Sequence, residues 1–360
     1  MTSSDKNISN DQFITGKITK SIKRRTFLIV VIGLIAIFLL YVFSLTIGAY
    51  SLTFSEAMEQ LFQVIITFGD PEEMGGRIIY NLRMPRSVAV LCVGAGLAVA
   101  GAVMQAMIHN PLVDPYVTGV SSGASFGVVI ITLSGAVAAS AYSPYLMPIG
   151  AIIGAVTSFI LTMTVAEISG GKAMSYVLGG TIIAAGLSAG TTLIMSSNAD
   201  KLHNITTWMF GSFAGIVWKE AVIIAIPTVL ILGYILFNSR KLNVMLLGED
   251  QARYLGMDAR KFKRNMLVIV AVLTAFCVSF CGVIGFVGLV VPHLCRMIVG
   301  GDHRVLIPSS IVVGSLVLLV ADIICKYGTA GELPIGAITS IVGVPFFIYL
   351  MIKEGKRYAM

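Results

Sequence analysis

The chain has 360 residues, and its composition places it in a membrane. Hydrophobic residues make up 56% of it, charged residues only 12%, and the mean hydropathy is +0.90. Soluble domains carry about 25% charged residues, so these values exclude a soluble enzyme, a nucleic-acid-binding domain and a disordered chain. The net charge of +7 is expected from the basic loops that orient membrane helices.

Ten apolar segments are candidates for crossing the bilayer, which takes about 20 residues per helix. The first follows a basic lead-in, but its 22 residues are too many for the apolar part of a signal peptide, so we expect a retained helix. The eighth is too short for an ordinary crossing. In chain order the segments are 27–48, 87–107, 119–139, 146–168, 175–196, 220–237, 266–283, 286–299, 305–326 and 335–351.

These segments predict an all-α integral membrane protein. We expect one transmembrane domain over 27–352, with cytoplasmic tails over 1–26 and 353–360. Cytoplasmic loops of membrane proteins are enriched in Lys and Arg. With a cytoplasmic N-terminus and alternating helices, 19 of the 25 basic residues fall on the cytoplasmic side. The sequence therefore predicts a multi-pass protein of the cell (cytoplasmic) membrane, with both termini inside.

Glycines spaced four residues apart recur in the second to fifth segments. Such spacing lets helices approach closely in lipid, where little hydrophobic force drives them together. We expect most of these glycines to serve packing and a minority to line a pathway. The spaced glycines are Gly119, Gly123 and Gly127, then Gly150 and Gly154, then Gly186 and Gly190.

Two Pro- and Gly-rich stretches, 109–115 and 285–293, interrupt the apolar pattern. Non-helical backbone at membrane depth must be buried in protein or line a cavity. The helices before the two stretches run in opposite directions, which predicts an inverted repeat of helices two to five against seven to ten. Two unrelated kinks are the alternative. The residues assigned to the broken helices or to a pathway are Gln105, Asn110, Pro111, Pro115, Gly119, Gly123, Gly285, Gly288 and Pro292.

The five cysteines and four histidines form no pattern that indicates chemistry. No CxxC occurs, and Cys277 and Cys281, one helical turn apart, are expected to pack as small hydrophobes. His293 has no second ligand at metal-binding spacing. We expect no catalytic residue, no metal site and no cofactor. The chain also lacks GxxxxGK[ST], so any ATP hydrolysis must come from a separate subunit.

The loop over 238–264 is the longest on the predicted cytoplasmic side. It is expected to hold a short amphipathic helix, with Gly248 and Gly256 as breaks and with Ala252 and Leu255 on one stripe. Such a helix at the membrane face is typical of a docking element for a soluble partner. A helix lying on the lipid surface is the alternative, but Glu249 and its acidic neighbour disfavour anionic lipid.

Taken together, the motifs resemble those of the FecCD-type permease subunits of ABC importers for iron-siderophores, haem and cobalamin. The matching stretches occur in order and cover about 27–352, nearly the whole chain. They are 83–86, 101–105, 110–115, 119–124, 208–211, 247–252, 255–256, 285–293 and 332–336.

This resemblance implies a type II ABC importer permease with broken helices. It implies two copies of an ABC ATPase subunit, an extracytoplasmic substrate-binding protein and a second permease subunit, either identical or a close paralogue. Arg83 and Arg86 match a basic pair that receives the binding protein's carboxylates, and Lys326 stands nearest to a further Arg of the family. The residues implied in ATPase coupling are Leu247, Gly248, Glu249, Ala252, Leu255 and Gly256.

We therefore expect a membrane-spanning permease that imports a metal chelate, namely a ferric siderophore, haem or a corrinoid. An ion-coupled secondary transporter is the first alternative. Its ion site would favour an acidic residue in mid-helix, but the acidic candidates stand at breaks or near helix ends. A membrane-embedded enzyme is the second alternative, and the scattered histidines supply no site for it. We expect the pathway lining to be apolar.

Overall fold

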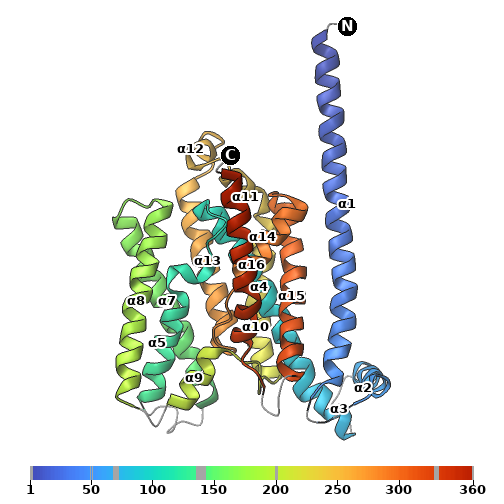
Figure 1. The fold of residues 1–360 in the computed structure, drawn as a ribbon, viewed down its shortest axis with the longest axis vertical. Coiled ribbons are helices and arrows are strands. Elements are labelled where there is room, and N and C mark those ends of the chain that lie inside the picture. The colour runs from blue at the N-terminus through green and yellow to red at the C-terminus, as the bar shows by residue number, and fades with distance from the viewer. Residues whose placement is uncertain are drawn as a thin grey trace.

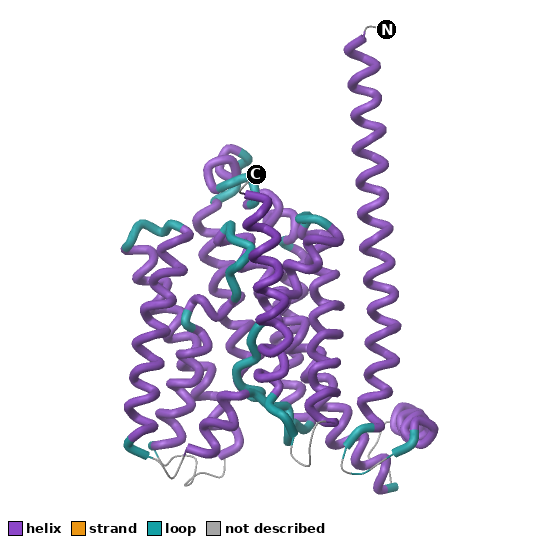
Figure 2. Tube along the Cα trace, in the orientation of Figure 1, coloured by secondary structure: helices purple, strands orange, loops and turns teal. Residues whose placement is uncertain are grey.

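The computed structural model describes residues 3–48, 50, 52–67, 73–134, 143–198, 202–327 and 332–358. Within these residues all regular structure is helical and no strand occurs (Figure 2). Figure 1 shows the helices gathered in a bundle, with α1 along one edge and extending far beyond it. A helix satisfies its own backbone hydrogen bonds, which is what an apolar chain in lipid requires.

All ten predicted apolar segments form helices. Among the described residues, seven spans are long and apolar enough to cross a membrane, and three apolar helices are shorter: α5, α14 and the apolar part of α16. The end of the segment predicted to reach residue 139 lies outside the described residues. The ten helices are α1 Ser3–Thr46, α4 Met84–Ile108, α5 Val120–Leu133, α7 Ser143–Ile168, α8 Ala173–Ser196, α10 Trp218–Phe237, α13 Ala259–Ser279, α14 Val287–Val299, α15 His303–Tyr327 and α16 Ile335–Tyr358.

The two predicted tails are helical wherever the structure describes them. Helix α1 begins at Ser3, well before the predicted start at residue 27, and α16 continues to Tyr358. No proline stands between residues 3 and 46 to stop the first helix. The sequence boundary at 27 therefore marks where the apolar composition begins, rather than where the helix begins.

Six shorter elements were not predicted, because they are too short for a crossing. The helix α2 packs Ala57 and Leu61 against Val42 and Leu45 of α1, in a small apolar cluster beside the main core. The six are α2 Phe54–Thr67, α3 Met74–Ile78, the π-helix η1 Ile79–Arg83, the 3₁₀-helix η2 Pro115–Thr118, α9 Leu202–Phe210 and α11 Ser239–Met245.

Helix α4 forms the centre of the bundle, and most of its residues are buried. Its small residues allow other helices to approach its backbone. A Cβ atom at Gly101 would lie 1.6 Å from the carbonyl oxygen of Gly288 in α14, and one at Gly94 would lie 2.4 Å from the carbonyl oxygen of Gly314 in α15. These positions accept no side chain, so glycine is required for the helices to pack at this distance.

The spaced glycines of α5 and α7 interlock as the sequence predicts. A Cβ atom at Gly127 would lie 2.0 Å from the Gly150 carbonyl oxygen, and one at Gly123 would lie 2.4 Å from the Gly154 carbonyl oxygen. In the third pair the two glycines differ: a Cβ at Gly190 would lie 3.1 Å from the Phe126 ring, whereas among the described residues nothing lies within 4 Å of a Cβ at Gly186. Most of the spaced glycines therefore pack closely, and Gly186 is the exception among them.

The two interruptions occupy equivalent places in the two halves of the bundle. Helix α4 ends at Ile108 and is followed by His109, which has a left-handed backbone (φ 54°), and the 14-residue α5 follows the break. Helix α13 ends at Ser279, and the 13-residue α14 begins after Phe286, which is also left-handed (φ 67°). This repeated order of long helix, break and short apolar helix agrees with the predicted inverted-repeat architecture.

The second interruption is displaced from its predicted position. The non-helical residues are 280–286, whereas 287–293 belong to α14, so Pro292 lies inside a helix. Proline has no N–H to donate to the Gly288 carbonyl four residues earlier. That carbonyl instead faces the bare backbone of Gly101 in α4, which makes the proline compatible with a helix at this point.

Candidate functional site

One end of the bundle carries a small protrusion, residues 246–257, which contains α12 (Glu249–Tyr254). Figure 1 places α12 beyond the bundle, at the end where both chain termini lie. Gly248 (φ 101°) and Gly256 (φ 80°) adopt backbone conformations that glycine tolerates best, and they bound the helix on either side. The short helix between two glycines is therefore confirmed.

The protrusion exposes large apolar side chains beside the polar side chains of Asp250, Gln251 and Arg253. The exposed fractions are 55% for Leu247, 90% for Tyr254 and 65% for Leu255, whereas Ala252 is completely buried. The predicted stripe that joined Ala252 to Leu255 is wrong, because the helix ends at Tyr254 and the chain turns at Gly256. Ala252 thus anchors α12 to the bundle, while the large apolar side chains point away from it.

Glu249 begins α12 and is held by α13 rather than being free. Its Oε1 atom lies 2.9 Å from Nζ of Lys263, whose side chain is almost fully buried. The Glu249 carboxylate, which the sequence predicts on the outer face of the protrusion, is therefore paired toward the bundle, and its side chain is only 34% exposed. The surface left for a partner combines the large apolar side chains with the exposed side chains of Asp250, Gln251 and Arg253.

The opposite end of the bundle holds an ion-pair cluster of Arg86, Asp322, Lys326 and Glu332. Arg86 donates from Nη2 (2.8 Å) and Nε (3.0 Å) to Oδ1 of Asp322, and from Nη1 (2.5 Å) to Oε1 of Glu332. Nζ of Lys326 lies 2.9 Å from Oδ2 of Asp322. Asp322 is fully buried, so it needs both cations to compensate its charge.

The predicted docking residues are therefore turned inward in this structure. Arg83 donates to the carbonyl oxygens of Leu45 and Tyr50, and Lys326 also donates to Ser44 at the end of α1 (2.9 Å). The sequence did not reveal these bonds, since Asp322 and Glu332 are more than 230 residues away from Arg86. Arg83 and Arg86 are therefore buried in this structure and do not form an exposed basic pair.

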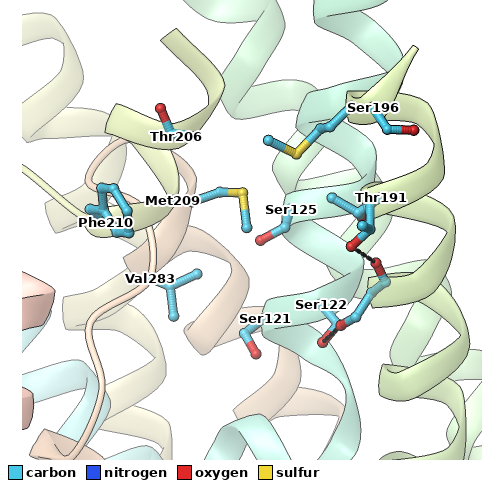
Figure 3. Close-up of a pocket in the computed structure, with 12 residues that line it drawn as sticks. Ser121, Ser122, Ser125, Thr191, Ser196, Thr206, Met209, Phe210 and Val283 are labelled. Carbon is cyan, nitrogen blue, oxygen red and sulfur yellow. Dashed lines mark hydrogen bonds between the residues drawn. The ribbon is translucent and has the colours of Figure 1, made fainter. Parts of the chain in front are cut away.

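A cavity of about 620 Å³ lies between α5, α8 and α9 (Figure 3). Figure 1 places α9 at the end of the bundle opposite α12. Eight of the twelve lining residues carry a hydroxyl group and none is charged. The lining residues are Ser121, Ser122, Ser125, Ser188, Thr191, Thr192, Met195, Ser196, Thr206, Met209, Phe210 and Val283.

Hydroxyl groups and apolar atoms share this lining, and the apolar atoms make up most of its exposed surface. The hydroxyl groups are neutral and can both donate and accept hydrogen bonds; Ser188 Oγ donates to Ser122 Oγ at 3.3 Å. The sequence did contain a signal for this hydroxyl-bearing face, because positions 188, 191, 192, 195 and 196 lie on one face of a helix. That signal was missed since the glycines of the same helix were read as a packing motif.

None of the predicted pathway residues lines this cavity. Instead several of them hold α14 against α4 and the first interruption: Gln105 donates to the Leu289 carbonyl (3.3 Å), and a Cβ at Gly288 would lie 2.8 Å from Pro115. Tyr116 strengthens this contact by donating to the Ile284 carbonyl (3.0 Å). The remaining predicted residues form turns or helix contacts, namely Asn110, Pro111, Gly119, Gly123, Gly285 and Pro292.

In the part of the chain that the structure describes, no group of three or more His, Cys, Asp or Glu side chains could hold a metal ion. Cys277 and Cys281 are free and buried within the apolar core, as small hydrophobic residues would be. The chemistry available to the described part of the bundle is therefore hydrogen bonding, apolar contact and ion pairing.

In the part of the chain that the structure describes, a helical bundle with seven membrane-length spans, two broken segments and an internal cavity defines a multi-pass membrane protein. The model of the FecCD transport family matches residues 34–353. The chain belongs to the FecCD transport family.

Relatives and a solved structure agree with this assignment. The chain is 37% identical over 287 residues to the cobalamin import system permease protein BtuC of Halobacterium salinarum, covering 79% of this chain and 76% of that protein. It is 34% identical over 336 residues to the iron(3+)-hydroxamate import system permease protein FhuB of Bacillus subtilis, covering 91% and 84%. A solved structure described as an inward-facing metal-chelate type ABC transporter matches with a TM-score of 0.79 at 30% identity, covering 90% of this chain and 99% of that one.

Proposed function

We propose that this chain is the membrane-spanning permease subunit of an ABC importer that carries a metal chelate across the cytoplasmic membrane. The chelate would be a ferric siderophore, haem or a corrinoid, as the two relatives for cobalamin and hydroxamate suggest. The observation that carries the proposal is the apolar protrusion at the α12 end. An ion-coupled transporter has no need of such an exposed docking element.

The α12 protrusion is the proposed contact with the ATPase subunit. Leu247, Tyr254 and Leu255 offer a compact apolar surface, and Tyr is among the residues that dominate binding energies at protein interfaces. The basic residues of the sequence cluster at this end, which supports a cytoplasmic location for it and for both termini. A soluble ATPase would meet the protrusion there.

The hydroxyl-lined cavity is the proposed part of the cargo pathway. A polar chelate loses hydrogen bonds to water when it enters the membrane, and neutral hydroxyl groups replace some of them without binding the cargo tightly. The adjacent face of α8 exposes large apolar residues, among them Leu178 and Ile182. We propose that a second permease subunit, identical or closely related, closes the pathway on this side.

The ion-pair cluster is the proposed place where the binding protein docks. In this structure a partner's carboxylate reaches Arg86 only by replacing Glu332, the one member of the cluster whose side chain is substantially exposed (39%). Such an exchange conserves the number of ion pairs, so docking would be reversible and sensitive to salt.

Reconstitution into liposomes tests this function. The permease is inserted with its ATPase subunit, ATP is enclosed, and ferrichrome, haem or cyanocobalamin is supplied outside with the binding protein. We expect uptake of one of the three that requires ATP hydrolysis. Uptake driven by a proton or sodium gradient in liposomes without the ATPase subunit would contradict the proposal and support the secondary transporter.

A further inference from the structure

Lys263 of α13 is a buried lysine whose ammonium group contacts three different structural elements. Its exposed fraction is only 4%. Nζ lies 2.9 Å from Oε1 of Glu249 in α12, 3.5 Å from the carbonyl oxygen of Gly171 in the turn after α7, and 5.1 Å from the centre of the Tyr176 ring in α8. One charged atom thus joins the protrusion to the connection between two bundle helices.

The burial of this ammonium group makes the three contacts depend on one another. Taking a charge out of water costs several kcal/mol unless ion pairing, hydrogen bonding or an aromatic face compensates it. If α12 moved away alone, Lys263 would lose Glu249, its only carboxylate partner in the part of the chain that the structure describes. The favourable response is for Lys263 and its partners to move together.

A second set of bonds fixes the same helix connection to α13. Glu167 at the end of α7 accepts a hydrogen bond from the Tyr176 hydroxyl (2.5 Å) and pairs with Nη2 of Arg260 (2.8 Å). Arg260 and Lys263 are three residues apart and lie on the same side of α13. Of the two, only Lys263 also reaches α12.

Helix α8 leads from this contact to the cavity. Tyr176 lies near its start, and Ser188 and Thr191 of the same helix line the hydroxyl-lined cavity. Twelve to fifteen residues of α-helix span about 18–22 Å. A rigid helix of this length carries a displacement of one end to the other.

We propose that Lys263 is a positioning residue that transmits movement of α12 to α8, and so to the wall of the cavity. The inference rests on the proposed docking of an ATPase subunit to the α12 protrusion. A nucleotide-driven movement of that subunit would displace α12, and Lys263 would pass the displacement to the inner end of α8.

The substitution Lys263→Met separates this role from a purely structural one. Methionine fills a similar volume with apolar atoms, and removing one partner of an ion pair is costly where the other charge stays buried. Glu249 is left partly solvated, because 34% of its side chain is exposed. A structural role therefore predicts little change in the variant, whereas a transmitting role predicts that α12 and α8 become independent.

Distance measurement between spin labels tests the proposal in the permease–ATPase complex in lipid nanodiscs. Labels are placed at Met174→Cys, exposed at the start of α8, and at Ile298→Cys, exposed at the end of α14, after the native cysteines are replaced. In the unmodified background we expect the distance to change by about 1–5 Å when ATP and vanadate are added. In Lys263→Met the change should be absent, although the ATPase subunit still co-purifies, and Lys263→Arg should restore it.

Arg304→Met is the matched control, since Arg304 also pairs with an acidic residue at this end but contacts only Asp302, two residues away. It should leave the distance change intact. The proposal is overturned if Lys263→Met keeps the distance change, or if it abolishes co-purification and so acts on assembly. If the unmodified permease binds no ATPase subunit, the proposed function fails first, and this inference fails with it.

Discussion

The α12 protrusion and the ion-pair cluster, at the two ends of the bundle, present different kinds of surface. At the α12 end, large apolar side chains such as Tyr254 point outward, and the buried charge of Lys263 lies beneath them. At the other end, Arg86 and Asp322 are turned inward and paired with each other. The difference indicates that the two ends are suited to different partners.

An exposed apolar surface binds by excluding water, so it suits a partner that remains attached. A cluster of internal ion pairs binds by exchanging one carboxylate for another, so it suits a partner that comes and goes. This distinction matches the proposed roles, with the ATPase subunit at the α12 end and the binding protein at the opposite end. The following changes test each half of the comparison.

The largest effect is expected from Asp322→Ala in the ion-pair cluster. The substitution leaves Arg86 and Lys326 with an uncompensated buried charge, which should destabilise the protein by about 3–5 kcal/mol. Thermal unfolding in detergent measures it. Glu332→Gln is the control and should cost much less stability, because the Glu332 side chain is partly in water. Equal losses of stability in the two variants would contradict the assignment of Asp322 as the more deeply buried carboxylate.

The next largest effect is expected from the double substitution Leu247→Arg and Leu255→Arg on the protrusion. Two charges placed in an apolar contact should weaken ATPase binding about 10-fold or more. Affinity in nanodiscs measures the loss. Lys241→Glu in the neighbouring α11 is the control for charge alone, and a similar loss there would argue against an apolar docking surface.

A smaller effect is expected from removing hydroxyl groups from the cavity. Ser188→Ala together with Thr191→Val should slow cargo uptake about 2- to 10-fold, as the loss of a hydrogen bond at about 0.5–1.5 kcal/mol implies. ATP hydrolysis should be unchanged. Thr181→Val, on the same helix but outside the cavity, is the matched control, and an equal loss of uptake there would place the pathway elsewhere.

The smallest effect is expected at Asp302, in the turn before α15. Hydrogen bonds from Arg304 lower the pKa of this carboxyl to about 2, below its ordinary value near 3.8. Its contribution to stability is therefore present above about pH 4 and is lost as the pH falls toward 2. In Asp302→Asn, the loss of unfolding free energy as the pH falls should be smaller by less than about 1 kcal/mol. An unchanged acid limb would contradict the assigned pairing.

The sequence predicted the elements that depend on composition. The ten apolar segments, the interlocking of Gly123 and Gly127 with α7, and the short helix before Gly256 follow from hydropathy, from small-residue spacing and from backbone freedom. Each of these signals is local, so a single sequence carries it. The helical extension at the N-terminus was missed because apolar composition, and not helix propensity, set the predicted boundary.

The side-chain partners could not be predicted from the sequence. Arg86 was expected to face a partner, but its carboxylates come from α15 and from the residues just before α16, and only the folded bundle brings them together. Lys263 was counted as one of many basic loop residues, although it is buried against α8 and α12. Burial of a charge depends on neighbours distant in sequence, which local patterns do not contain.

The most direct test of the account is photocrosslinking from each end of the bundle in the assembled transporter. The photoreactive residue p-benzoylphenylalanine replaces Tyr254 in one variant and the exposed Met74, at the opposite end, in another. We expect the first variant to crosslink to the ATPase subunit and the second to the binding protein. Crosslinks to the ATPase subunit from position 74, or to the binding protein from position 254, would contradict it.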